Sequence, residues 1–215
     1  VVALLGHNGA GKSTLIKIIA GVHTDYDGTM KIRGQSVRLR SARDALANSI
    51  GMVHQELSIV PELTVAENVF LGNQPLTSLG TVDWRRELGN HLSPELIASL
   101  GLNIDPTTTM GSLPVGLQQL VELSRVLFSG AQIIILDEPT SALSPPEVRQ
   151  LFEVLRRLRA EGRSMVFISH FLDDVLEISD RVTVFRNGEK VITEDTKNLT
   201  KDDVISYMIG RGSKG

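Results

Sequence analysis

The sequence predicts an α/β fold with a mixed, mainly parallel sheet, an antiparallel β subdomain and an inserted α-helical subdomain. Apolar runs typical of buried strands alternate along the chain with segments of helical periodicity. The first apolar run, residues 1–5, leads directly into a glycine-rich loop and then into a helix. A later run, residues 133–136, is apolar at every position, which is typical of a parallel strand buried on both faces.

The size and composition indicate a globular protein with one domain of ordinary size. The chain has 215 residues, of which 41% are hydrophobic and 22% charged. The net charge of −3 gives no broad basic field for nucleic acid or anionic lipid. Cysteine is absent, which excludes disulfides and thiolate metal sites and fits a reducing compartment. Every apolar run is far shorter than the roughly 20 residues of a membrane-spanning helix.

The loop at residues 6–14, GHNGAGKST, fits the phosphate-binding pattern G-x-x-x-x-G-K-[ST]. Glycines let main-chain N–H groups surround an anion, and the helix N-terminus adds partial positive charge. Lys12 can reach the β- and γ-phosphates, and the Ser13 hydroxyl can hold Mg²⁺. The alternative, a glycine-rich turn that matches by chance, is disfavoured by the flanking strand and helix. We therefore predict a P-loop NTPase (RecA-like) core.

The chain is expected to be a fragment. It does not begin with Met, and a strand that feeds a P-loop normally lies inside a sheet. We expect sequence before Val1 to be missing.

After the first helix, the pattern predicts an antiparallel hairpin, a short helix and a buried strand. Ser41 and Asp44 have the spacing of a capping box at the start of the short helix. These elements are expected at residues 29–39, 41–48 and 50–53, and the strand leads into His54 and Gln55.

The middle of the chain predicts a helical subdomain at residues 62–130, inserted into a core of residues 1–61 and 131–215. Thr64 and Glu67 are expected to cap its first helix. The pattern then predicts a helix to residue 70, a loop at 73–83, a helix at 84–100 broken near residue 93, a loop at 103–112, and a strong helix at 116–128.

The last third predicts strands alternating with helices and a terminal hairpin. Ser144 begins a long helix, and its arginines are interpreted as a solvated helix face. Asn187-Gly188 is a strong signal for a hairpin turn. The expected strands are at residues 131–136, 164–168, 181–186 and 189–193, and the helices at 144–161, 172–178 and 200–209.

Two carboxylates, Asp137 and Glu138, follow the strand of residues 133–136 at the expected ligand edge of the sheet. Asp137 is placed to accept from the Mg²⁺ shell, and Glu138 can polarise the water that attacks the γ-phosphate. The alternative is a plain acidic turn, which becomes improbable downstream of a P-loop. Together the motifs predict an ATP site.

In order and wording, these motifs resemble the ATP-binding cassette (ABC) ATPases over essentially the whole chain. Gln55 lies where the family has its Q-loop, and His170 where it has its switch histidine. LPVGL at residues 113–117 takes the place of the LSGGQ-like signature. MVHQEL at 52–57 and LTVAENVFLG at 63–72 are similar to the first cassette of bacterial ribose/xylose/galactose importer ATPases.

The resemblance implies a role for each matching residue. The nucleotide-binding residues would be Gly6, His7, Asn8, Gly9, Ala10, Gly11, Lys12, Ser13, Thr14, Gln55, Asp137 and His170. The catalytic residues would be Glu138, His170 and Gln55, and the Mg²⁺ ligands Ser13, Gln55 and Asp137. Pro114, Val115, Gly116 and Gln118 would contact the ATP of another cassette. Taken alone, Gln55 and His170 could be ordinary polar loop residues.

The signature departs from the family pattern. Pro114 replaces its serine and Leu117 its last glutamine, so a hydroxyl, an N–H and an amide are lost. The aromatic residue that stacks on adenine lies upstream of the P-loop in the family and is not in this sequence.

The function implied is ATP hydrolysis that powers import of a sugar through a membrane ABC transporter. The chain would be peripheral, at the cytoplasmic face of the cell membrane. Its partners would be a second ATP-binding cassette, a membrane permease contacted near residues 56–72 and, indirectly, a periplasmic or extracellular sugar-binding protein, with no nucleic acid. The alternatives are a degenerate regulatory cassette with slow hydrolysis and a non-transport ABC ATPase.

Overall fold

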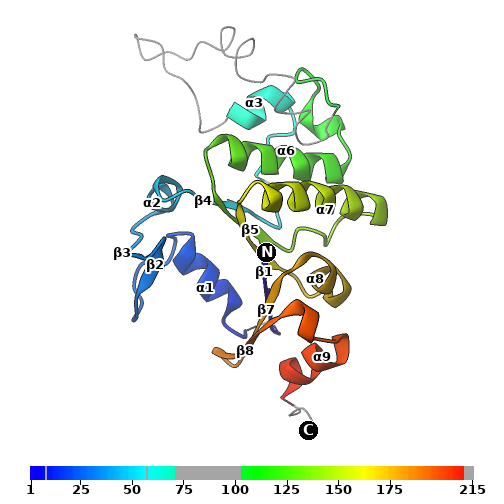
Figure 1. The fold of residues 1–215 in the computed structure, drawn as a ribbon. Coiled ribbons are helices and arrows are strands. Elements are labelled where there is room, and N and C mark those ends of the chain that lie inside the picture. Colours follow the sequence, from blue (N-terminus) through cyan, green and yellow to red (C-terminus); the bar gives the residue numbers. More distant parts are fainter. Residues whose placement is uncertain (8, 57, 71–102, 211–215) are drawn as a thin grey trace. The chain divides into compact units, whose positions relative to one another are not determined.

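The computed structural model of the chain describes all residues except 8, 57, 71–102 and 211–215 (Figure 1). The described residues divide into two compact units. The first holds residues 1–55, 130–141 and 158–215, and the second holds residues 56–129 and 142–157. The loop and helix predicted at residues 73–83 and 84–100 lie outside the described residues. The domain boundaries predicted from the sequence stay a prediction.

The first unit is built on a sheet with the strand order β4-β5-β6-β1-β7-β8. Neighbouring strands are parallel except β7 and β8, which form an antiparallel hairpin. The predicted fold class, an α/β fold with a mixed, mainly parallel sheet, is therefore confirmed. The strands are β1 (Val2–Leu5), β4 (Ile50–Val53), β5 (Ile133–Asp137), β6 (Ser164–Ile168), β7 (Arg181–Arg186) and β8 (Glu189–Asp195).

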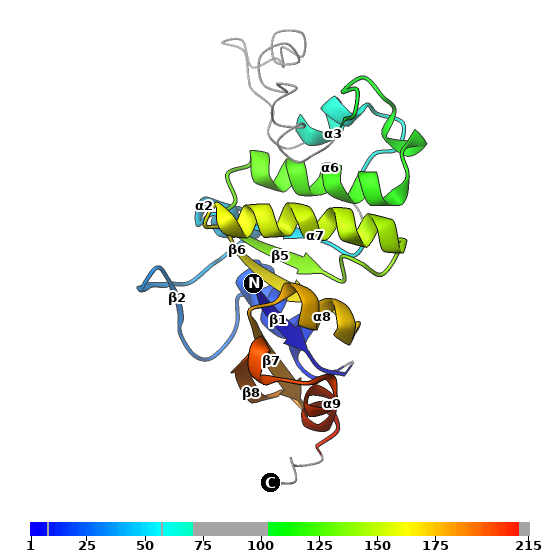
Figure 2. The same ribbon diagram turned by 45° about the vertical axis from the view of Figure 1, so that its right-hand side comes forward.

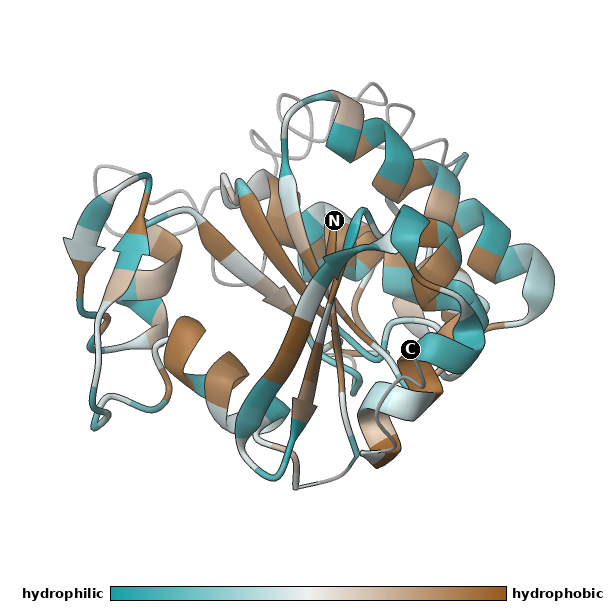
Figure 3. Cartoon of the chain, turned by 60° about the horizontal axis from the view of Figure 1, so that its bottom comes forward, coloured by the Kyte–Doolittle hydropathy of each residue, from teal (hydrophilic) through white to brown (hydrophobic). Residues whose placement is uncertain are grey.

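The strand β1 lies at the centre of this sheet, where Val2 is in register with Val166 of β6 and with Arg181 of β7. Continuous apolar strands are buried on both faces, and Figure 3 shows their hydrophobic residues in brown. Leu5 and Phe167 are both 0% exposed. The core of the first unit therefore lies along β1 and its neighbours.

Helices pack on the sheet of the first unit. This unit also contains a separate two-stranded antiparallel ribbon, as predicted. The helix α1 packs Ile16 into a buried cluster with Leu4 of β1 and Ile135 of β5. The helices are α1 (Lys12–Ile19), α2 (Ala42–Ala47), α8 (Leu172–Ile178) and α9 (Lys201–Ile209), with a 3₁₀ turn η2 (Thr196–Asn198). The ribbon pairs β2 (Met30–Ile32) with β3 (Gln35–Val37).

The caps of these helices follow the sequence, with one correction. Thr200 and Asp203 form the complete capping box of α9. Ser41 accepts a hydrogen bond from the Asp44 N–H at α2, but the Asp44 carboxylate accepts from the Arg40 N–H instead of the Ser41 N–H. The predicted reciprocal box at Ser41 is therefore wrong in its second bond, because Asp44 binds the N–H one residue earlier.

The second unit is helical. It contains α3 (Val65–Phe70), a 3₁₀ turn η1 (Met110–Ser112), α6 (Val115–Phe128) and most of α7 (Pro145–Ala160). Figures 1 and 2 show α6 and α7 side by side. Leu120 and Leu123 of α6 and Phe152 of α7 are at most 2% exposed, so an apolar stripe on each helix forms this core.

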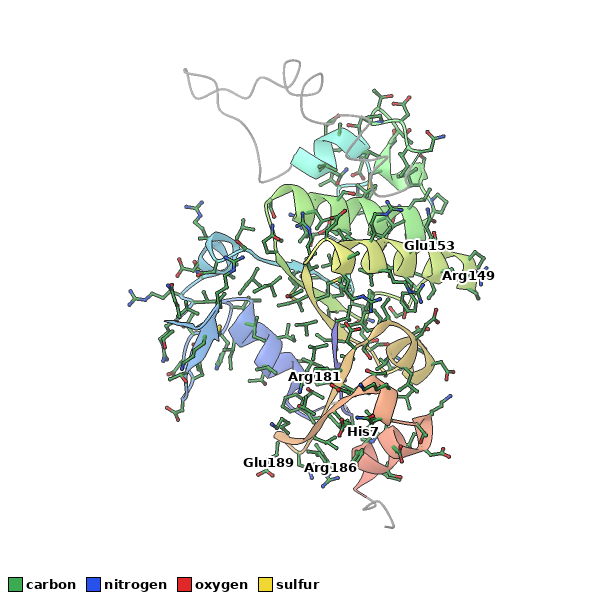
Figure 4. The ribbon with its side chains drawn as sticks, viewed as in Figure 1. His7, Arg149, Glu153, Arg181, Arg186 and Glu189 are labelled. Carbon is green, nitrogen blue, oxygen red and sulfur yellow. The ribbon has the colours of Figure 1, made fainter. Side chains whose placement is uncertain are left out.

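The outer face of α7 is polar, as the sequence predicts. Arg149 and Glu153, labelled in Figure 4, are exposed and lie one helical turn apart. The consecutive residues Arg156 and Arg157 are exposed as well. None of the helices in the described part of the chain combines the length and apolar character that a membrane span requires.

Candidate nucleotide-binding site

The P-loop joins β1 to α1 and takes the backbone conformations that only glycine adopts easily. Gly9 has φ 81° and Gly11 has φ 102°, both in the left-handed region. Gly11 is the N-cap residue of α1 and makes no side-chain capping hydrogen bond. The first N–H groups of α1 therefore have no side-chain acceptor at the cap, which leaves them for an anion such as phosphate.

The loop is held in place by the turn between β7 and β8. The Gly188 N–H donates to the Ala10 carbonyl at 3.0 Å. A Cβ atom at Gly6 would lie 2.7 Å from the Phe185 carbonyl oxygen and 2.9 Å from the Ala10 Cβ. Glycine is therefore needed at position 6 for close packing. Figure 4 labels His7 in this region, with Arg186 and Glu189 of the hairpin.

A pocket of about 670 Å³ opens beside this loop within the first unit. Its polar wall combines the P-loop with the carboxyl ends of β4 and β5, as expected for a parallel sheet. This wall is made by His7, Gly9, Ala10, Gly11, Lys12, Ser13, Thr14, His54, Gln55, Asp137 and Glu138. Apart from Gly6 and His170, the described nucleotide-site residues predicted from the sequence thus meet in one cavity. Asn8 lies outside the described residues.

The charges around the pocket are shifted by burial and by one another. Burial, with the neighbouring Glu138 charge, raises the pKa of Asp137, while His54 and Lys12 oppose this rise. Burial lowers the pKa of Lys12, while the charges of Glu138 and Asp137 raise it. Two carboxylates therefore face one lysine ammonium in a partly desolvated site. The negative charge of these carboxylates therefore favours the binding of a cation in the pocket.

The donor set fits Mg²⁺ bound together with a phosphate substrate. Ser13, Gln55 and Asp137 line the same pocket. Among the residues that the structure describes, no group of three or more His, Cys, Asp or Glu side chains could hold a metal. Mg²⁺ commonly takes only one or two carboxylates and completes its shell with substrate phosphates and water. The residues would therefore hold the ion only when a nucleotide supplies the other ligands.

Glu138 has the most constrained geometry in the site. Its φ of 47° is unusual for a residue other than glycine. Its carboxylate lies 3.1 Å from the His170 Nδ1, and this side chain is 14% exposed while that of His170 is 60% exposed. The Oε2 atom of Glu138 is buried and lies 3.1 Å from the same His170 Nδ1, which is also 3.1 Å from Oε1. The single ring nitrogen donates one proton at most, so the two carboxylate oxygens keep acceptor capacity for a water molecule beside the P-loop.

His170 and His54 show what the sequence could and could not indicate. His170 follows β6 and contacts Glu138, but it does not line the pocket. His54 lines the pocket and its charge acts on Asp137, yet the sequence prediction did not include it. Its place at the carboxyl end of β4, directly before Gln55, is the signal that could have identified it.

The altered signature lies at the start of α6 in the second unit. Pro114 is the N-cap residue of α6 and makes no side-chain capping hydrogen bond. The Gln118 amide nitrogen donates to the carbonyls of Met110 and Leu113, both at 3.1 Å. Gln118 is thus engaged in holding its own loop. The contact predicted between the signature and the ATP of another cassette stays a prediction.

Glu147 of α7 reaches the same end of α6. Its Oε1 accepts from the Ser144 N–H at 3.0 Å and the Ser144 hydroxyl at 2.7 Å, and these bonds lower its pKa. Its Oε2 is buried beside Gly116, where an added Cβ would collide with it. A carboxylate therefore occupies the space that the missing side chain of Gly116 provides.

Sequence comparison finds relatives along the whole chain. The ribose import ATP-binding protein RbsA of Caldanaerobacter subterraneus is 42% identical over 214 residues, which are 100% of this chain and 43% of that protein. A putative ribose/galactose/methyl galactoside import ATP-binding protein of Burkholderia cenocepacia is 45% identical over 209 residues, 97% of this chain and 40% of that protein. The chain thus spans less than half the length of these relatives.

Structure comparison agrees. The crystal structure of an ATP-binding cassette of an ABC transporter in its ADP conformation has a TM-score of 0.79 at 26% identity, covering 98% of this chain and 88% of that one. A nucleotide-free cassette has a TM-score of 0.78 at 23% identity, covering 99% and 85%, which supports the fold alone. The sequence profile described as ABC transporter matches residues 1–141, and the chain belongs to this family.

Proposed function

We propose that this chain is the ATP-hydrolysing nucleotide-binding subunit that powers import of a sugar through a membrane ABC transporter. The observation that carries the proposal is the meeting of the P-loop with Lys12, Asp137 and Glu138 in one pocket. Phosphate, a cation and an attacking water each have a suitable partner there. The names of the relatives, which are sugar import ATP-binding proteins, support the transported class.

Each polar group has a distinct role in this proposal. The N–H groups of the P-loop and the Lys12 ammonium bind the phosphates. Ser13, Gln55 and Asp137 hold Mg²⁺, which neutralises charge on the phosphates when bound. Glu138 accepts a proton from the attacking water, and the acceptor capacity that its carboxylate keeps beside the single His170 nitrogen supports that role. His170, which contacts Glu138 but does not line the pocket, would reach the γ-phosphate of a bound nucleotide.

The proposed partners follow from the same family membership. A second ATP-binding cassette completes the site, a membrane permease docks near residues 56–72, and a periplasmic or extracellular sugar-binding protein acts through the permease. The protein would then be peripheral, on the cytoplasmic face of the membrane. The strongest support is the importer naming of relatives that match nearly the full length of this chain.

The test is sugar-stimulated ATP hydrolysis by the full-length protein assembled with its permease in vesicles. Glu138→Gln should lower the single-turnover rate by about 100-fold or more, because the general base is lost while nucleotide binding remains. Glu153→Gln, on the exposed face of α7, is the matched control and should leave the rate unchanged. Equal rates for Glu138→Gln and the wild type would contradict catalysis and favour a regulatory cassette.

A further inference from the structure

One partly buried hydrogen bond connects the turn after Glu138 to the helix after His170. The Thr140 hydroxyl donates to Oδ2 of Asp174 at 2.8 Å. Thr140 is 4% exposed and Asp174 is partly exposed, so the donor end of this bond is shielded from water. Both residues belong to the first unit, and neither has a role in the proposed function.

The turn that carries Thr140 needs external support. Its first residue, Glu138, has a φ of 47°, and a residue other than glycine keeps such a backbone conformation only where the surrounding structure holds it. The Glu138 N–H donates to the Ile168 carbonyl at 2.8 Å, and its carbonyl accepts from the Ser141 hydroxyl at 3.1 Å. Thr140 lies inside this turn, so its side-chain bond restrains the same strained backbone.

The helix that carries Asp174, α8, is held in place by packing in the core. Val175 and Ile178 of α8 are 0% and 1% exposed, which fixes the helix in the core. His170 lies just before α8, and its Nδ1 contacts the Glu138 carboxylate at 3.1 Å. The Thr140–Asp174 bond is therefore a second connection between the segment that carries Glu138 and the segment that carries His170.

We propose that Asp174 is a positioning residue, which acts through Thr140 to hold the Glu138 carboxylate against His170 and toward the attacking water. The inference rests on the proposed function, because it assigns Glu138 as the general base. The neighbouring Asp173 provides the contrast. Its side chain is 82% exposed and pairs with Lys201 at 3.1 Å on the surface.

The test is the steady-state ATPase activity of the full-length protein with substitutions at both ends of the bond. Thr140→Val and Asp174→Ala should each lower kcat about 10-fold, because a small displacement of a general base is costly. KM for ATP should stay within about 2-fold, since neither side chain lines the nucleotide pocket. Thr140→Ser and Asp174→Asn, which keep a donor and an acceptor, should restore kcat to within about 2-fold.

Two controls separate positioning from a general loss of structure. Asp173→Ala changes the adjacent carboxylate and should leave kcat unchanged. The double variant Thr140→Val/Asp174→Ala should be no slower than either single variant, because both remove one interaction. If thermal melting shows that Thr140→Val does not fold, the comparison of Asp174→Ala with Asp174→Asn still decides.

The opposite results overturn the inference. They are a raised KM with unchanged kcat, multiplicative losses in the double variant, or no recovery in the two conservative variants. Failure of the proposed function is recognised separately, because Glu138→Gln would then hydrolyse ATP at the wild-type rate. If Glu138→Gln is inactive while Thr140→Val is fully active, the general base stands and the positioning role of Asp174 falls.

Discussion

At the scale of the residue, Asp137 and Glu138 are adjacent carboxylates, and their surroundings disfavour the ionised form of Asp137. Asp137 is partly buried next to Glu138, and both effects raise its pKa. Lys12 and His54 offset this only in part. Ionised Asp137 therefore destabilises the nucleotide-free protein, and a bound cation would offset this cost. A binding site commonly lowers the stability of the free protein in this way.

This strain predicts that Asp137→Asn stabilises the nucleotide-free protein at neutral pH. A folded-state pKa raised above the usual value of 3.8 means that the ionised carboxylate destabilises the fold once the pH exceeds the folded-state pKa. The asparagine lacks this cost, so its thermal midpoint should be higher at pH 7. The gain should fade as the pH drops through the raised pKa and vanish below 3.8, where the wild-type carboxyl is protonated in both states.

Thermal unfolding followed by circular dichroism from pH 4 to pH 8 measures this difference. Glu153→Gln removes an exposed carboxylate and should leave the midpoint almost unchanged across the range. A midpoint for Asp137→Asn below that of the wild type at pH 7 would contradict the prediction. Mg²⁺-dependent hydrolysis should be lost in the same variant, because the carboxylate that supports the ion is gone.

At the scale of the element, the sequence predicts those strands and helices whose formation depends on neighbouring residues alone. The strand at residues 50–53, the helix at 172–178 and the start of the last helix at Thr200 are confirmed, because apolar periodicity and cap residues determine them locally. The apolar run from residue 131 predicts too long a strand, since β5 begins at Ile133. Glu138's positive φ and the Thr140–Asp174 bond could not be predicted, because both depend on segments distant in sequence.

The N-terminus of α6 carries the next prediction. Pro114 leaves this helix end without a side-chain cap, and Gln118 is bound to its own loop. The double change Pro114→Ser/Leu117→Gln supplies a hydroxyl, a backbone N–H and a side-chain amide as donors for the proposed contact with a phosphate bound by another cassette. A single bond to a charged group is worth about 1.5–3 kcal/mol, and about 1.4 kcal/mol is a factor of ten in rate, so the ATPase rate of the assembled transporter should rise by about 10-fold or more.

The measurement is ATP hydrolysis by the assembled transporter in vesicles. Pro146→Ser is the control, because it makes the same exchange at an exposed position near the start of α7 and should leave the rate unchanged. An unchanged rate in the double variant would mean that this signature does not limit hydrolysis.

At the scale of the whole molecule, strand order explains why distant motifs meet. β1 and β5 end at the same edge of the parallel sheet, so the loops after them bring Lys12 and Asp137 into one pocket. The alternation of strands and helices predicts a parallel sheet, but not that β1 lies between β6 and β7. That order depends on long-range pairing, which single-sequence periodicity does not contain.

The central position of β1 makes its last residue a test of how far the sheet supports the site. Leu5 is 0% exposed and directly precedes Gly6, so Leu5→Ala removes buried methyl groups and leaves a cavity under the P-loop. Such a change costs about 3 kcal/mol of unfolding free energy. For a chain of this size, about 2–4 °C of thermal midpoint is lost per kcal/mol, so the midpoint should fall by about 6–12 °C. Leu46→Ala is the same substitution at a position that is 40% exposed, and its midpoint should drop far less. Thermal unfolding of both variants measures the difference directly. Equal midpoints for the two variants would mean that the centre of the sheet does not carry the stability on which the P-loop depends.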